Sequence, residues 1–132
     1  MTRVLALDYG SARCGCAISD PTGTVATPLP IVERPATKRG TAALVALVAV
    51  QGADRVVVGL PLTMAGQEGS QALETREFAE RLRARVTVPV ELHDERLTTR
   101  MADRTGGSAA SDSVAAAHLL ESYLAAQPGA VS

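Results

Sequence analysis

The stretch that decides the fold is Val4-Leu5-Ala6-Leu7-Asp8-Tyr9-Gly10, close to the start of the chain. Four consecutive apolar residues are typical of a strand that is buried on both faces, and Gly10 then breaks the strand. Asp8 follows the apolar run directly. Open α/β sheets bind their ligands at the carboxyl ends of their strands, so this position predicts a functional carboxylate. An Asp at such a point also caps turns, and that second interpretation stays open.

The rest of the chain supplies the strands and helices that would surround this strand. Hairpin spacing predicts an antiparallel start, and the later alternation of strands with helices predicts parallel strands with helices on their faces. Pro28 and Pro30 cannot donate ladder hydrogen bonds, which places the third strand at a sheet edge. Ser111 is the expected N-cap of the last helix. The expected strands cover 14–19, 24–32, 55–61 and 89–93, and the expected helices cover 41–51, 70–86, 98–104 and 111–126.

Size and composition limit the function classes. The chain has 132 residues, of which 46% are apolar and 20% charged, which indicates a single globular domain over residues 1–132. Its net charge of −1 argues against a strongly basic nucleic-acid-binding coat. Only 2% of the residues are aromatic, so stacking on exposed bases is not expected to be a main mode of binding.

Cysteine usage and hydropathy indicate the compartment. Cys14 and Cys16 do not make a disulfide framework or a zinc site, so we expect buried, reduced thiols. No apolar run approaches the roughly 20 residues that span a bilayer, and the N-terminus lacks the features of a signal peptide. We therefore expect a soluble cytoplasmic protein that does not bind membranes. The apolar helix over 41–51 is either buried or part of a subunit contact, so a monomer and a homodimer both remain open.

Two further candidate acids follow the strand expected over 89–93. Asp94 and Glu95 stand at its carboxyl end, as Asp8 does at the end of the first strand. Strand alternation places Asp94 on the side of Val90 and Leu92 and Glu95 on the opposite side. The sequence does not say which of these sides faces a site. By contrast, we interpret the acids of the helix over 70–86 as a solvated polar face; they are Glu74, Glu77 and Glu80.

Asp112 is a candidate because of its spacing. Ala116, Leu119 and Tyr123 lie four, seven and eleven residues later, so Asp112 shares the apolar face of its helix, where an unpaired carboxylate is costly. Acids in a first helical turn are also favoured by the helix dipole, which leaves a structural role open. Carboxylates that converge at one sheet edge repel one another, and divalent cations relieve this repulsion. Oxygen ligands suit Mg²⁺ or Mn²⁺, which promote phosphodiester cleavage.

Four segments of the chain together form one recognisable pattern. They are residues 6–10 with Arg13, Gly15, Ala17, Ser19 and Asp20; residues 57–62 with Met64 and Gly66; residues 94–99 with Ala102; and Asp112 with Ala115, Ala116, Leu119, Leu120, Tyr123 and Leu124. In this order they resemble the YqgF family, also called RuvX, of Holliday-junction-resolvase-like proteins and pre-16S ribosomal RNA nucleases. The resemblance extends over almost the whole chain.

The resemblance implies an α/β, ribonuclease H-like fold, in which helices flank a mixed five-stranded sheet whose first three strands are antiparallel. It also implies a nuclease that uses Mg²⁺ or Mn²⁺ to process the 5′ end of precursor 16S ribosomal RNA. Related resolvases carry their second acid where this chain has Gly59, so an acid of the 94–95 pair would replace it. The residues carried over are Asp8, Glu95 and Asp112 as catalytic acids, the same three with Asp94 as metal ligands, and Arg13 and Arg96 as nucleic-acid contacts.

Other functions remain open at this point. A non-catalytic RNA-binding factor in ribosome assembly or transcription fits the charge balance, because residues 105–111 carry no Lys or Arg for a phosphate backbone. A Holliday junction resolvase acting on branched DNA would use the same chemistry as a symmetric dimer. An actin-like ATPase is a third alternative, but it needs two such domains and this chain has the length of one.

Overall fold

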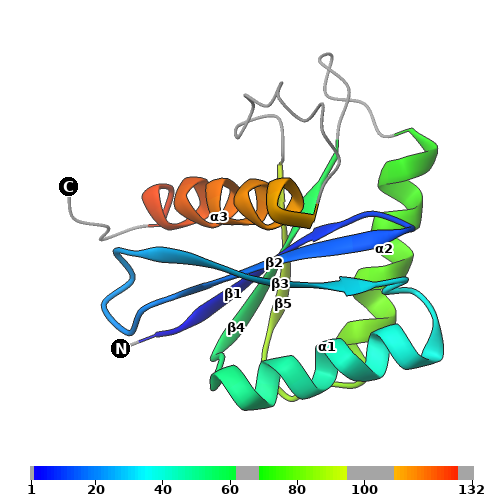
Figure 1. The fold of residues 1–132 in the computed structure, drawn as a ribbon, viewed down its shortest axis with the longest axis horizontal. Coiled ribbons are helices and arrows are strands. Elements are labelled where there is room, and N and C mark those ends of the chain that lie inside the picture. The colour runs from blue at the N-terminus through cyan, green and yellow to red at the C-terminus, as the bar shows by residue number, and fades with distance from the viewer. Residues whose placement is uncertain (1, 62–68, 95–108, 128–132) are drawn as a thin grey trace.

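The fold is an α/β layer structure with one mixed sheet (Figure 1). A computed structural model describes residues 2–61, 69–94 and 109–127, with the backbone alone for residues 109–112. The expected order of strands and of three of the four helices is confirmed, and the helix expected over 98–104 lies outside the described residues. The elements are β1 (Val4–Tyr9), β2 (Arg13–Ser19), β3 (Ala26–Glu33), α1 (Lys38–Gln51), β4 (Arg55–Leu60), α2 (Ser70–Arg83), β5 (Val90–Asp94) and α3 (Ala109–Ala125).

The sheet has the strand order β3-β2-β1-β4-β5, with β1 in the middle. The β1–β2 and β2–β3 pairs are antiparallel, which confirms the expected start, and β1–β4 and β4–β5 are parallel. The strand that carries Pro28 and Pro30 is indeed an edge strand. Because β1, β4 and β5 run in the same direction, their carboxyl ends meet at one edge of the sheet.

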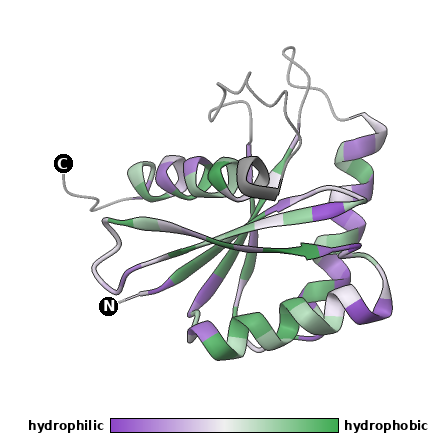
Figure 2. Cartoon of the chain, viewed as in Figure 1, coloured by the Kyte–Doolittle hydropathy of each residue, from purple (hydrophilic) through white to green (hydrophobic). Residues whose placement is uncertain are grey.

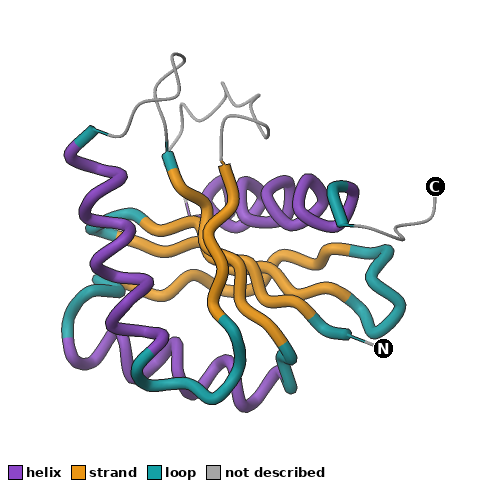
Figure 3. The backbone as a smooth tube through the Cα atoms, turned by 180° about the vertical axis from the view of Figure 1, so that it is seen from behind, coloured by secondary structure: helices purple, strands orange, loops and turns teal. Residues whose placement is uncertain are grey.

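Each face of the sheet has its own core. Alternate residues of β1 point to opposite faces, so Leu5 and Leu7 join the core under α1 and α2, whereas Val4 and Ala6 join the core under α3. Figure 1 shows α3 on one side of the sheet and α1 on the other, and the reverse view in Figure 3 shows the same separation. Buried alanines, among them Ala116, let α3 approach the strands closely.

Helix α1 differs from the expectation in two respects. It begins at Lys38 rather than at residue 41, because Thr37 is its N-cap and its side-chain oxygen accepts a hydrogen bond from the Gly40 N–H at 3.0 Å. Only one of its sides is buried, through Thr41, Leu44 and Val48. The opposite side is apolar and exposed, with Val50 79% exposed, and Figure 2 shows hydrophobic colour along the helix.

The other differences are confined to element ends. Helix α2 ends at Arg83, three residues early, because the N–H groups of Arg85 and Val86 both bond to the Leu82 carbonyl and turn the chain toward β5. Helix α3 starts at Ala109, so Ser111 lies inside the helix and is not its N-cap. The third strand starts at residue 26 rather than 24, after the turn that Asp20 closes by accepting from the Thr24 and Val25 N–H groups.

The two cysteines are buried and form no disulfide, as the sequence indicates. Cys14 and Cys16 are buried, free thiols, and both belong to the core under α1 and α2. Among the helices that the structure describes, none is both long enough and apolar enough to cross a membrane.

Phe78 provides the first testable prediction. Its side chain is fully buried and stacks on Tyr9, with 4.5 Å between ring centroids. Phe78→Ala removes this packing at the end of β1 and should lower the free energy of unfolding by about 3–5 kcal/mol, measured by urea denaturation. Leu73→Ala is the matched control on the same helix. Leu73 is 57% exposed, so its loss should change stability by less than about 0.5 kcal/mol, and an equal effect of the two would contradict this account of the core.

Candidate active site

Asp8 stands near the carboxyl end of the middle strand. It is half-buried, and alternation from Val4 and Ala6 directs it to the face that α3 covers. It is not without partners, because it takes part in an interaction within the structure. Its placement at the edge where β1, β4 and β5 end agrees with the position predicted for a functional carboxylate.

Glycines flank Asp8 on both neighbouring strands. Gly15 of β2 is paired directly with Asp8. On the other side Leu7 is paired with Val58, so the next residue of β4, Gly59, stands beside Asp8. Neither neighbour therefore projects a side chain next to the carboxylate on this face. The absence of a Cβ at both neighbouring positions permits a close approach to the Asp8 carboxylate, as a cation or a phosphodiester would require.

Asp94 lies on the other face of the sheet. It is the last residue of β5 and is paired with Leu60. By alternation it shares the side of Val90 and Leu92, whose side chains belong to the core under α1 and α2. The structure thus brings Asp94 to the same edge as Asp8 but not to the same face. Glu95 and Arg96, the other candidates of this segment, lie outside the described residues.

Asp112 lies in the first turn of α3, and its side chain is outside the description. The next residue locates this end of the helix: the hydroxyl of Ser113 donates a hydrogen bond to the Leu29 carbonyl. Leu29 is paired with Cys16, and Cys16 with Leu7. Along the strand direction the first turn of α3 is therefore level with the end of β1, on the face to which Asp8 points, but it contacts β3, which is separated from β1 by β2.

Arg13 joins Asp8 on this face. It is the first residue of β2, and alternation places it with Gly15 and Ala17, of which Ala17 packs under α3. Because Gly15 is directly opposite Asp8, Arg13 occupies the diagonal position, which is within reach of a long side chain. Of the two expected nucleic-acid contacts, the structure thus brings one beside Asp8.

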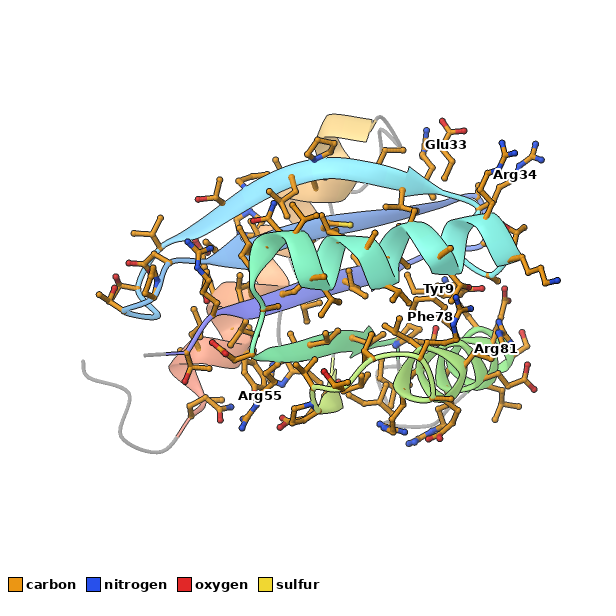
Figure 4. All side chains as sticks on the ribbon, turned by 90° about the horizontal axis from the view of Figure 1, so that it is seen from below. Tyr9, Glu33, Arg34, Arg55, Phe78 and Arg81 are labelled. Atoms are coloured by element: carbon orange, nitrogen blue, oxygen red, sulfur yellow. The ribbon has the colours of Figure 1, made fainter. Side chains whose placement is uncertain are left out.

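The end of β1 is held by contacts of Tyr9 with Phe78 and Glu74, which we call the Tyr9 clamp and which the sequence does not predict. The Tyr9 ring packs on Phe78 (Figure 4). Its hydroxyl donates to Glu74 Oε2 at 3.0 Å. Burial, together with the neighbouring Glu74 carboxylate, raises the pKa of Tyr9 to about 12, so the phenol keeps its proton. Glu74 lies on the exposed face of α2, as expected, yet it also fixes the residue that follows Asp8. Its spacing of four residues from Phe78 was the one available signal.

The two histidines have partners within the fold. His93 Nε2 lies 3.0 Å from Ser122 Oγ, and its ring meets Tyr123 edge-on at 5.6 Å. Burial lowers the pKa of His93, which favours the neutral ring. His118 is exposed and lies 3.5 Å from Glu121.

The described residues alone do not complete a metal site. Within residues 2–61, 69–94 and 113–127, no three side chains of His, Cys, Asp or Glu are grouped so that they could hold an ion. The donor chemistry nevertheless fits a hard divalent cation, because Asp8 offers carboxylate oxygens at a glycine-flanked position. The carboxylates of Glu95 and Asp112 are the further candidates, and both lie outside the described side chains.

Comparison with known proteins gives a consistent result. A family model described as RuvX, Holliday junction resolvase, matches residues 2–126. A relative from Chloroflexus aurantiacus named "Putative pre-16S rRNA nuclease" is 43% identical, over 94% of this chain and 87% of its own. A relative with the same name from Mycolicibacterium paratuberculosis is 41% identical, over 92% and 79%.

Among solved structures, Thermus thermophilus RuvC in complex with Holliday junction substrate is similar with a TM-score of 0.55. The match covers 96% of this chain and 98% of RuvC at 14% identity. At that identity the match shows a shared fold, which is the ribonuclease H-like architecture expected from the sequence.

Proposed function

The chain belongs to the RuvX family, and from that premise we propose that it is a metal-dependent endonuclease that processes the 5′ end of precursor 16S ribosomal RNA. The observation that carries the proposal is the placement of Asp8. It lies at the carboxyl end of the middle strand, between two glycines, on the face where the first turn of α3 brings Asp112 to the same level. The names of the relatives support the substrate.

We assign the second acid to Glu95 rather than Asp94. Asp94 shares the face of Val90 and Leu92, whereas Asp8 and α3 are on the opposite face. The proposed ligand set for Mg²⁺ or Mn²⁺ is therefore Asp8, Glu95 and Asp112. A divalent metal bound there would supply an activated water and stabilisation for the leaving oxygen of a phosphodiester.

The chain's own residues position the substrate around this set. Gly15 and Gly59 place no side chain directly beside Asp8 on the two neighbouring strands, and the Tyr9 clamp fixes the end of its strand. Arg13 is placed to contact a phosphate beside the cleavage point, and Arg96 is the second proposed contact. Cys14 and Cys16 are buried in the core of the other face and are not available as nucleophiles. Cleavage by water is therefore the proposed route.

The test is cleavage of an RNA that contains the 5′ leader of precursor 16S RNA. With Mn²⁺ or Mg²⁺ the protein should release the mature 5′ end, mapped by primer extension, and EDTA should stop the reaction. If the folded protein binds this RNA but does not cut it in the presence of either Mn²⁺ or Mg²⁺, the protein is an assembly factor instead. This activity would place the protein in the cytoplasm, as the sequence predicts.

Branched DNA is the second candidate substrate, because the matching family model is described as Holliday junction resolvase. Resolution of a four-way junction needs two cuts related by symmetry and hence a dimer. A synthetic four-way junction in the same assay separates the two candidates. Symmetric cuts in the junction without cleavage of the RNA leader would favour DNA.

A further inference from the structure

Three exposed cations lie within six residues where β3 leads into α1: Arg34, Lys38 and Arg39. Among the described residues, none of the three is in an ion pair. Elsewhere the fold does pair its arginines, for example Arg55 with Glu91 at 3.2 Å and Arg83 with Glu80. The three side chains are therefore exposed and form no ion pair with the described part of the chain, although Glu33 is the neighbour of Arg34.

The charges of Lys38 and Arg39 are unfavourable for the stability of α1. They occupy the first turn of α1, and no acid is present there. The N-terminus of a helix carries a partial positive charge, so cations in the first turn are unfavourable and acids favourable. The cap itself is already provided by Thr37. Helix stability thus offers no reason for two basic residues at this place.

Arg34 is also held in a costly conformation. Its φ of 47° is the left-handed region, which Gly or Asn adopts far more readily than Arg. Its carbonyl accepts from the Thr37 N–H at 3.1 Å and from the Thr37 hydroxyl at 2.8 Å. Gly40 packs so closely on this carbonyl that a Cβ there would lie 2.0 Å from it. The backbone of the turn is therefore closely packed, and Figure 4 shows the Arg34 side chain pointing outward beside Glu33.

This turn is tied to the edge of the sheet that carries Asp8. The Arg34 N–H donates to the Ala12 carbonyl at 2.9 Å, in the loop between β1 and β2. The next residue, Arg13, is diagonal to Asp8. In the register of β2 and β3 it lies opposite Glu33, which is the one acid of the segment 33–39. The turn that carries Arg34 is therefore held at the same end of the sheet as Asp8 and Arg13, and α1 starts from this turn on the opposite face of the sheet.

We propose that Arg34, Lys38 and Arg39 form a second RNA contact, which holds the phosphate backbone of the substrate beyond the cleavage point. This inference rests on the proposed function and adds a binding surface to it. The contact is made by charge, so it would position the RNA without reading its sequence. It would also supply phosphate contacts that residues 105–111, which contain no Lys or Arg, do not provide.

The experiment compares two matched double variants, Lys38→Gln/Arg39→Gln and Arg3→Gln/Arg85→Gln. Arg3 and Arg85 lie at the opposite end of the sheet, just before β1 and between α2 and β5. Binding of the leader RNA is measured in EDTA, without cleavage, across a range of salt concentrations. The 38/39 variant should bind roughly 10- to 30-fold more weakly at 0.15 M salt, with a salt slope smaller by about 1 to 2. The 3/85 variant should bind like the wild type.

Stability provides an independent readout. The melting temperature of the 38/39 variant should stay equal or rise, because the cations oppose the helix dipole. Arg34→Asn suits the left-handed turn and should likewise weaken RNA binding without lowering the melting temperature. A scrambled hairpin RNA of equal length should show the same loss of affinity.

Unchanged affinity and salt slope in the 38/39 variant would overturn the proposal, as would a loss restricted to the native RNA sequence. A wild type that binds no RNA would overturn it as well. If the wild type binds the leader without cutting it, the proposed nuclease function fails while the comparison of the double variants still decides the contact.

Discussion

Asp8→Asn is expected to lower cleavage of the precursor RNA leader on the order of 10³-fold without unfolding the protein. Loss of the carboxylate charge should weaken metal binding by the proposed ligands. A bound metal stabilises the transition state by several kcal/mol as a Lewis acid, and each ~1.4 kcal/mol changes the rate tenfold. The substitution preserves the shape of a half-buried side chain beside Gly15 and Gly59, so the sheet should remain intact. Single-turnover cleavage and circular dichroism measure the two effects.

Asp54→Asn is the matched control for this variant. Asp54 lies just before β4, at the opposite end of the sheet, where its Oδ2 accepts the Arg3 N–H at 2.9 Å. The Asp54→Asn substitution makes the same chemical change away from the site and should leave the cleavage rate within about twofold of the wild-type rate. A folded Asp8→Asn protein that cuts as fast as Asp54→Asn would remove Asp8 from the site.

Glu95→Gln should have an effect as large as that of Asp8→Asn, whereas Asp94→Asn should cost less than about tenfold. The two acids are neighbours in sequence, and the alternation expected of a strand would direct their side chains to opposite faces. Asp94 shares the face of Val90 and Leu92, and Asp8 faces α3. Loss of a metal ligand removes several kcal/mol of transition-state stabilisation, and loss of a charge on the other face does not.

Both variants keep the side-chain volume, so each is the control for the other. Cleavage rates over a Mn²⁺ titration give the apparent metal affinity as well as the maximal rate. A severe loss in Asp94→Asn with a near-normal Glu95→Gln would reverse the assignment. Equal severe losses would mean that both acids belong to the site.

The strands were predictable because their signals are local. The apolar run 4–7 and the edge prolines Pro28 and Pro30 were sufficient for the middle strand and the edge strand. The start of α1 was not predictable in this way, because the apolar periodicity of a helix begins at its first apolar residues and carries no information about the turn before them. The cap at Thr37 works together with the close approach of Gly40 to Arg34, and contact of this kind is a tertiary feature.

The sequence predicts which residue types form the candidate site but not the faces of the sheet on which they lie. Strand alternation predicts opposite faces for Asp94 and Glu95, yet only the packing of α3 on Val4 and Ala6 shows which face Asp8 uses. The hydrogen bond from Tyr9 to Glu74 joins residues 65 positions apart, and no local pattern reports such a contact. The same limit applies to Arg34. Its N–H donates to the Ala12 carbonyl, and this long-range contact places Arg34 at the end of the sheet that carries Asp8.

The most direct test of the central claim, that Asp8 belongs to a metal-dependent nuclease site on the α3 face, is an anomalous diffraction map from crystals of the protein soaked in Mn²⁺. The account predicts a manganese peak in contact with a carboxylate oxygen of Asp8, with Glu95 and Asp112 as the other protein ligands. A peak bound through Asp94 on the opposite face, or no peak at Asp8 at saturating Mn²⁺, would contradict it.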